Sequence, residues 1–355
     1  MKVGDYIVEV NGSAGEQYDD NINYAENKRL DDFITSFGGD MTLKREAKTW
    51  DLELKGGLKQ EIFAEYGKND NLEKTFDGEL LWELDKKQRL TSSESFQNAE
   101  QQTTYEDISG SEGGRYEFYR NTFNLGYEND ISKQVLFTTN YTNGYYEQLD
   151  GFGTNGFRSY LDGGRVMVSY MKSSETTFMV MTNGMYRYTG SGQDSKMVGQ
   201  FVGIRQYLTQ KIYIDLMGGV DVINAFNKKQ YIEGNYSGMI SGDVSRRTNL
   251  SVKLDKRYEE TYYNQSISDL WSLNFNVRHE LSKRLRCNFN SYFSSRQYDA
   301  DPNNPDQYIG CRIGFSYDIM ENIRFDASYG YSRQMSKINR EYYKNVVTAG
   351  INILF

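Results

Sequence analysis

Short polar turns divide this chain into long hairpins, and no other feature restricts its fold as strongly. They recur at intervals of roughly 36 to 45 residues, about the length of one long β-hairpin with its loop. The turns are centred near Ala47, Lys86, Ser132, Ser173, Thr209, Arg246, Ser282 and Glu321. Longer polar segments are expected near 19–30, 66–71, 102–114, 148–158, 189–194, 225–230, 258–265, 298–306 and 335–341, the eighth of which contains both prolines. Eight short turns and nine long loops predict about 18 antiparallel strands, an even number as in bacterial barrels.

The segments between these turns alternate apolar and polar residues. In 270–281, for example, Trp271, Leu273 and Phe275 face one way and polar residues face the other. The same period runs through 212–222, 309–319 and 323–331. A soluble β-sandwich shows this period too, but its strands are usually about five or six residues long, whereas these segments are longer and carry charges and glycines on the polar face. The pattern favours strands with one face toward lipid and one toward water.

The chain closes on a strand of the same kind. Val347, Ala349, Ile351, Ile353 and Phe355 fall on one face, and Thr348, Gly350 and Asn352 fall on the other. A terminal aromatic after an alternating strand is typical of outer-membrane β-barrels, and an ordinary edge strand of a soluble protein is the alternative. We interpret Gly350, Ile353 and Phe355 as the signal that the barrel-assembly machinery recognises.

Composition supports the membrane interpretation. The chain contains 30 Tyr, and its mean hydropathy is -0.74. No stretch approaches the roughly 20 apolar residues of a transmembrane helix, whereas a barrel needs aromatic girdles and exposes only half of each strand to lipid. We therefore predict one all-β domain over residues 1–355: a transmembrane up-and-down antiparallel barrel in the cell outer membrane, with short periplasmic turns and long extracellular loops. No signal peptide precedes the first strand, which we interpret as a mature chain.

Nothing in the sequence indicates catalysis or a cofactor. A net charge of -8 disfavours a nucleic-acid partner. His279 is the single histidine, and no G-x-S-x-G motif occurs. We therefore predict no enzymatic activity, no metal and no cofactor. Cys287 and Cys311 fall on adjacent predicted strands; a disulfide remains open, but two small lipid-facing hydrophobes are favoured.

The other face of the strands carries both signs of charge. Because a charged side chain facing lipid is costly, these residues are expected to point into the lumen. Asn274, Asn276, Asn290 and Tyr292 add amide and aromatic groups there. Such a mixture bonds hydroxyls and stacks on sugar rings, although a wide barrel also needs polar lining simply to enclose water. The predicted pore-lining set is Arg120, Arg165, Arg187, Arg205, Asp215, Asp221, Arg278, Glu280, Arg312, Asp318, Arg324 and Asp326.

Both ends of the chain carry short motifs. Asp19-Asp20-Asn21-Ile22 precedes Asp32-Phe33-Ile34, and Glu341-Tyr342-Tyr343-Lys344-Asn345 precedes the last strand. They resemble the opening hairpin and the end of the β-barrel porin 2 family of outer-membrane proteins, with Glu341 in place of that family's aspartate. The resemblance implies a pore through which a capsular polysaccharide or exopolysaccharide leaves the cell.

Three functions follow as hypotheses. The first is a channel for export of a polysaccharide, with periplasmic export proteins as partners. The second is a general diffusion porin for small solutes. The third is a structural barrel that forms a sheath within a larger outer-membrane complex.

Overall fold

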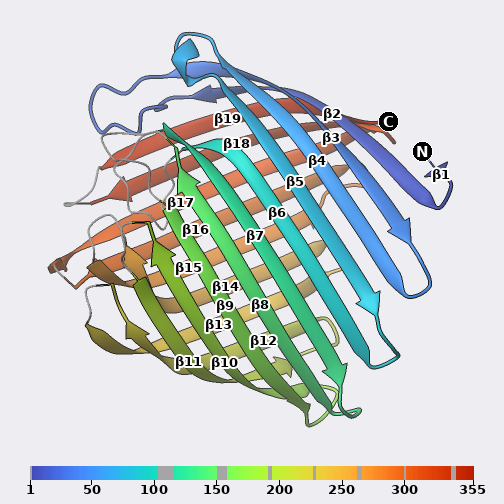
Figure 1. Ribbon diagram of the computed structural model, residues 1–355. Coiled ribbons are helices and arrows are strands. Elements are labelled where there is room, and N and C mark those ends of the chain that lie inside the picture. The colour runs from blue at the N-terminus through green and yellow to red at the C-terminus, as the bar shows by residue number, and fades with distance from the viewer. Residues whose placement is uncertain are drawn as a thin grey trace.

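The chain folds into a closed antiparallel β-barrel, described here from a computed structural model (Figure 1). The structure describes residues 2–102, 115–149, 158–190, 194–226, 229–261, 266–299, 301–336 and 341–355. Within them, eighteen long strands, β2 to β19, each pair with the next, and β19 pairs with β2 to close the wall. No helix in these ranges is both long and apolar enough to cross a bilayer.

The strand bounds follow the predicted hairpins. A two-residue strand, β1 (Lys2–Val3), and a short 3-10 turn, η1 (Gly67–Asn69), are additions to the barrel strands. The barrel strands are β2 (Tyr6–Asp19), β3 (Asp32–Glu46), β4 (Trp50–Phe63), β5 (Asn71–Glu83), β6 (Gln88–Gln102), β7 (Arg115–Asp130), β8 (Val135–Gln148), β9 (Arg158–Met171), β10 (Thr176–Thr189), β11 (Asp194–Tyr207), β12 (Ile212–Asn224), β13 (Gln230–Ser245), β14 (Thr248–Thr261), β15 (Ser266–Glu280), β16 (Leu285–Tyr298), β17 (Asp301–Met320), β18 (Ile323–Met335) and β19 (Tyr342–Leu354).

All eight predicted short turns lie where strands reverse at one end of the barrel. Hydroxyls shape several of them, because Ser132, Ser173 and Ser282 each accept backbone N–H groups two and three residues further on. Both termini lie at this same end (Figure 1). In outer-membrane barrels as a class, the short-turn end faces the periplasm and the long-loop end faces the exterior.

The predicted loops at the other end are confirmed at 19–30 and 66–71, and most of the remainder fall partly or wholly outside the described residues. One prediction was wrong. The segment 298–306 is mostly strand, because β17 begins at Asp301 and includes both prolines. The register shifts there from Arg296↔Asp306 to Tyr298↔Asp301, so residues 302–305 form a bulge in the ladder. Proline lacks an N–H, and a bulge is where a strand tolerates it. The segment 258–265 is also shorter than expected, since β14 continues to Thr261.

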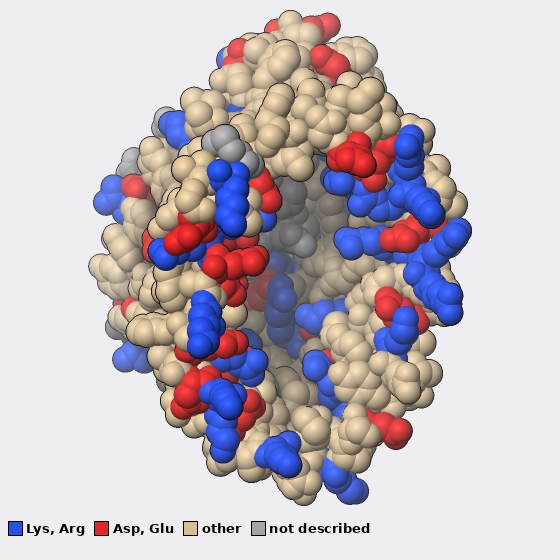
Figure 2. All heavy atoms as spheres, turned by 90° about the vertical axis from the view of Figure 1, so that its right-hand side faces the viewer, with Lys and Arg blue, Asp and Glu red and all other residues tan. Residues whose placement is uncertain are grey.

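The two faces of the wall differ in chemistry. Large apolar side chains stand exposed on the outer parity, for example Val202 at 65 % and Ile232 at 67 %. Charged and amide side chains occupy the inner parity. Viewed from the short-turn end, basic and acidic groups crowd the rim of a wide central opening (Figure 2). The outward parity is therefore the lipid-facing surface, and the inward parity encloses the lumen.

The difference between the two faces predicts that a charged substitution destabilises the barrel on its outer face much more than on its inner face. Val202→Arg, in the middle of β11, is expected to lower the free energy of unfolding by about 2–4 kcal/mol, the usual cost of arginine near the bilayer midplane. Ser237→Arg is the matched control, because Ser237 faces inward on β13 opposite Asp255. It should change stability by less than about 1 kcal/mol. Urea titration of both variants in lipid vesicles measures the difference, and equal losses would contradict this assignment of faces.

Candidate functional site: the barrel lumen

All twelve predicted lining residues lie on the inward parity. Each of them alternates with outward neighbours along its strand, which for Arg312 are Cys311 and Ile313. Across the strands, Arg205 lies opposite Asp215. The twelve residues therefore face the lumen, as the alternation of the strands predicts. That they contact a passing solute stays a prediction.

Several of these charges neutralise one another near the short-turn end. Arg205 forms a bidentate ion pair with Asp215 on the adjacent strand. Its Nε and Nη2 donate to the two carboxylate oxygens at 2.6 Å and 2.7 Å. Arg286 and Arg324 both donate to Asp318, at 2.8 Å and 2.9 Å. These pairs stabilise a polar wall: Arg205 and Asp215 cancel each other's charge, while the cluster around Asp318 keeps one positive charge.

The remaining predicted residues are spread around the wall. The Arg120 guanidinium lies over the rings of Phe118 and Tyr146, 5.4 Å and 5.9 Å from their centroids. Asp221 is only 3 % exposed and accepts a hydrogen bond from Asn235. Arg187 is half-buried on β10, whereas Arg165, Arg278, Glu280 and Arg312 are exposed. The structure therefore does not gather the twelve into one site.

A hollow on the inner wall brings a different set together. It encloses about 470 Å³ against β15 to β19, in the half of the lumen nearer the long loops. Four of its amide and aromatic residues, and Arg312 from the charged set, were predicted from the strand period to face the lumen. Its polar and aromatic side chains include Gln17, Tyr24, Asn274, Asn276, Asn290, Tyr292, Tyr308, Arg312, Ser332, Tyr342 and Lys344.

Glycines and tyrosines give the hollow its shape. Gly310 and Gly330 form part of its floor, and a Cβ added at Gly330 would meet no atom closer than 3.8 Å. Tyr292 and Tyr308 pack with ring centroids 5.8 Å apart. On the other side, Tyr24 meets Tyr342 edge to face at 5.1 Å. Two aromatic pairs thus border a glycine floor, an arrangement that can accept the apolar face of a sugar ring.

A row of amides completes the hollow. Asn276 lies opposite Asn290, and Asn290 lies opposite Arg312 across the next pair of strands. None of the amides of Asn274, Asn276 and Asn290 has a hydrogen-bond partner among the described residues, and all three reach solvent. Each amide can both donate and accept, which matches a hydroxyl group. The row is therefore able to bind a polyhydroxylated solute.

The segment 20–31 folds back against the inner wall and supplies Tyr24. Ile22 is 2 % exposed and packs on Ile34 and Phe63, which face inward from β3 and β4. Asn21 is fully buried and bonds the backbone of Ala25 in both directions, at 2.8 Å and 2.9 Å. Tyr24 takes a left-handed φ of 51°, which costs a residue with a side chain about 1–3 kcal/mol. The surrounding contacts hold it there.

The two ends of the chain meet at this point. Lys344 Nζ lies 2.6 Å from an oxygen of Asp19, and their side chains are 5 % and 0 % exposed. Asn345 donates from its backbone and its amide to the two oxygens of Asp20, at 2.6 Å and 2.7 Å. These residues belong to the two terminal motifs of the sequence. The two motifs therefore link β2 to β19 at the long-loop end of the seam, the pairing of these two strands that closes the barrel. Lys344 also donates to the Tyr24 hydroxyl at 3.0 Å.

Sequence reasoning missed part of this hollow. Tyr308 and Tyr342 share the inward parity of their strands, so the alternation could have identified them. Tyr24 gave no such signal, because it lies in a loop. Its place depends on a contact with Lys344, 320 positions away along the chain.

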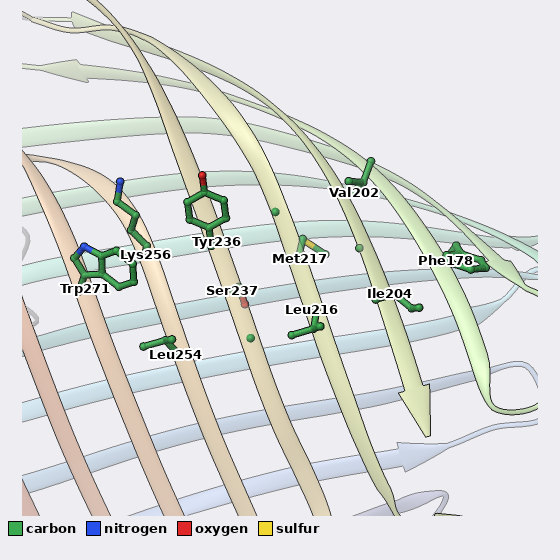
Figure 3. A pocket seen from close by; sticks show the side chains of 13 residues that line it. Phe178, Val202, Ile204, Leu216, Met217, Tyr236, Ser237, Leu254, Lys256 and Trp271 are labelled. Carbon is green, nitrogen blue, oxygen red and sulfur yellow. The ribbon is translucent and has the colours of Figure 1, made fainter. Parts of the chain in front are cut away.

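The outer wall has its own hollow, of about 640 Å³, over β10 to β15 (Figure 3). Leu216, Tyr236, Leu254 and Trp271 are among the side chains that border it. Lys256 lies beside it and pairs with an acidic side chain of β15 at 3.2 Å. This surface is mostly apolar, as the lipid-facing parity requires.

The cysteines are free thiols on adjacent strands, as favoured from the sequence. Cys287 and Cys311 lie on the outward parity of β16 and β17, opposite Phe315 and Ser291. Within the described residues, no group of three or more His, Cys, Asp or Glu side chains is placed to hold a metal ion.

Solved structures share the fold at very low sequence identity. A mutant of the ferric enterobactin receptor from Pseudomonas aeruginosa is 8 % identical, with a TM-score of 0.53 over 98 % of this chain and 80 % of that one. The FrpB iron transporter from Neisseria meningitidis is 9 % identical, with a TM-score of 0.54 over 93 % of this chain and 62 % of that one. The copper transporter OprC is 12 % identical, with a TM-score of 0.51 over 96 % of this chain and 63 % of that one. This likeness concerns the fold alone.

In the sequence comparisons, a protein-family model matches part of the chain. No curated protein is significantly similar to it. The model of the family described as "Putative beta-barrel porin 2" matches residues 230–355. This range contains β13 to β19 and the C-terminal motif, while the N-terminal motif lies outside it. The resemblance inferred from the motifs is therefore confirmed over residues 230–355, and the whole chain has the closed antiparallel β-barrel fold of outer-membrane barrels.

Proposed function

We propose that this protein is an outer-membrane channel through which a polysaccharide leaves the cell. The observation that carries the proposal is the hollow on β15 to β19, where two tyrosine pairs, a glycine floor and a row of solvent-reaching amides face the lumen. Tyrosine faces and amides together suit a polymer of sugars. These groups are few and open to water, so each contact with a sugar is weak. A polysaccharide can therefore move along the lumen without being held at one site. We propose no catalytic step.

The family matched by residues 230–355 supports the channel part of the proposal, because it is described as a family of barrel porins. Periplasmic export proteins are the partners that such a channel would require, and the barrel-assembly machinery and outer-membrane lipid are the others we propose. The charged pairs near the short-turn end enclose water and suit a diffusion porin equally well. The hollow is what favours a sugar polymer.

Planar lipid bilayers test the proposal. The purified protein is expected to conduct ions, and oligosaccharides added on either side should interrupt the current, because a bound chain excludes ions from the lumen. Asn290→Leu and Tyr308→Ala should each raise the half-blocking concentration of a neutral oligosaccharide about tenfold, the usual effect of one lost aromatic or hydrogen-bonded contact. Met239→Leu, which lies inward on β13 and outside the hollow, is the control and should leave the block unchanged.

Two results would overturn the proposal. A membrane that conducts no better than bare lipid would exclude a channel. Ion conduction without any block by oligosaccharides would favour a general diffusion porin. In cells, deletion of the gene should remove surface polysaccharide if the protein exports it, and should slow uptake of a small nutrient if it is a porin.

A further inference from the structure

The hollow on β15 to β19 carries positive charge in a protein that is negative overall. The whole chain has a net charge of -8. Yet the described residues that line the hollow include two basic side chains, Arg312 and Lys344, and no acidic one. Lys344 is neutralised, since it is buried against Asp19 at 2.6 Å. Arg312 is therefore the charge that a solute in the hollow would meet.

The Arg312 guanidinium is only partly engaged. Its Nε donates to the Ser328 hydroxyl at 3.0 Å. No ion pair or hydrogen bond joins its two terminal nitrogens to any described residue. On β18, the Asp326 carboxylate instead accepts hydrogen bonds from Ser316 and Asn352. By contrast, three other inward arginines are each paired with a carboxylate, namely Arg205, Arg286 and Arg324.

The neighbours of Arg312 leave room for a ligand. Gly330 lies opposite it on β18 and Gly310 precedes it by two positions on the same face, so no side chain covers it from these sites. Asn290 lies opposite on β16, and the Tyr292–Tyr308 pair is beside it. A sugar ring on the tyrosines would thus place a substituent near the guanidinium.

We propose that the hollow selects acidic sugar units and that Arg312 is the residue that determines this preference. The inference rests on the proposed function and names its substrate class: a polysaccharide that bears carboxylates, as uronic acids do. The two terminal nitrogens of Arg312 form a fork that matches a carboxylate. Asn276 and Asn290 would bond the ring hydroxyls.

Current block by two matched oligosaccharides tests the inference. Tetragalacturonate and maltotetraose have the same length and differ in charge. At one fixed ionic strength, the acidic compound is expected to block at about one tenth of the concentration, the effect of one charge-assisted pair. Arg312→Gln should raise the half-blocking concentration of the acidic compound to that of the neutral one. Arg312→Lys should restore part of the preference, because lysine keeps the charge and loses the fork.

Arg89→Gln is the matched control. Arg89 faces inward on β6, pairs with Glu128 at 3.0 Å and lies outside the hollow. It makes the same change in total charge and should keep the preference for the acidic compound. Equal block by both compounds in the unaltered protein would overturn the inference and leave the proposed function standing. Loss of the preference in Arg89→Gln as well would show that total charge, and not Arg312, controls it. Absence of block by either compound would count against the proposed function itself.

Discussion

Lys344→Met is expected to destabilise the barrel by about 3–5 kcal/mol, because it leaves the carboxylate of Asp19 buried without its counter-charge. The Asp19 side chain is fully buried, and Lys344 is its partner at 2.6 Å. The substitution also removes the hydrogen bond to Tyr24. The folded band on an unheated SDS gel should disappear at a lower temperature, and the urea midpoint in detergent micelles should fall.

Two further variants test whether the loss of stability comes from the unpaired Asp19 carboxylate or would follow the removal of any lysine from the lumen wall. Lys55→Met breaks a more exposed pair with Asp40 at 3.5 Å and should cost less than about 1 kcal/mol. Asp19→Asn combined with Lys344→Met removes both charges and should regain much of the lost stability. If Lys344→Met melted like Lys55→Met, the seam would not depend on this buried pair.

Phe355→Asp is expected to reduce the amount of folded barrel in the outer membrane by more than about tenfold, the scale of a lost 1.4 kcal/mol interaction with the assembly machinery, while protein refolded in detergent keeps its conductance. Phe355 is 72 % exposed on the short-turn rim, and its backbone N–H donates to the Val10 carbonyl oxygen at 2.8 Å. Its side chain thus contributes little to packing, and that N–H survives substitution. Loss of assembly without loss of function in vitro is the result that a signal for the assembly machinery predicts.

The control places the same charge at the same rim. Leu281 follows β15 in a short turn and is 47 % exposed. Leu281→Asp should assemble nearly as well as the unaltered protein, because it leaves the C-terminal strand intact. Pulse labelling followed by recovery of the heat-modifiable form measures both variants. Normal assembly of Phe355→Asp would show that the terminal aromatic is an ordinary strand end.

The strands and their facing could be predicted because the cause is local. Trp271 and Arg278 must lie on opposite sides of β15, since side chains alternate and lipid excludes charge. Turn residues such as Ser132 and Ser282 set the ends of hairpins by bonding their own backbone. The prolines misled this reasoning, because a bulge at the start of β17 removes the ladder bonds that proline cannot make.

The candidate site could be predicted only in part. Asn274, Asn290 and Arg312 were assigned to the lumen from the strand period. Nothing local indicated which inward residues would share a hollow, because that depends on register across β15 to β19 and on two glycines in its floor.

What the amino-acid sequence determined by itself is the barrel: an even set of alternating strands, the face each side chain takes and the end at which the chain closes. These follow from interactions within one hairpin or between a side chain and its solvent. Only the tertiary structure decided that Asp19 and Lys344 meet, that Tyr24 enters the lumen and that Arg312 lies beside a glycine floor. Those contacts join distant parts of the chain, and the closure of β19 on β2 is what brings its two ends together.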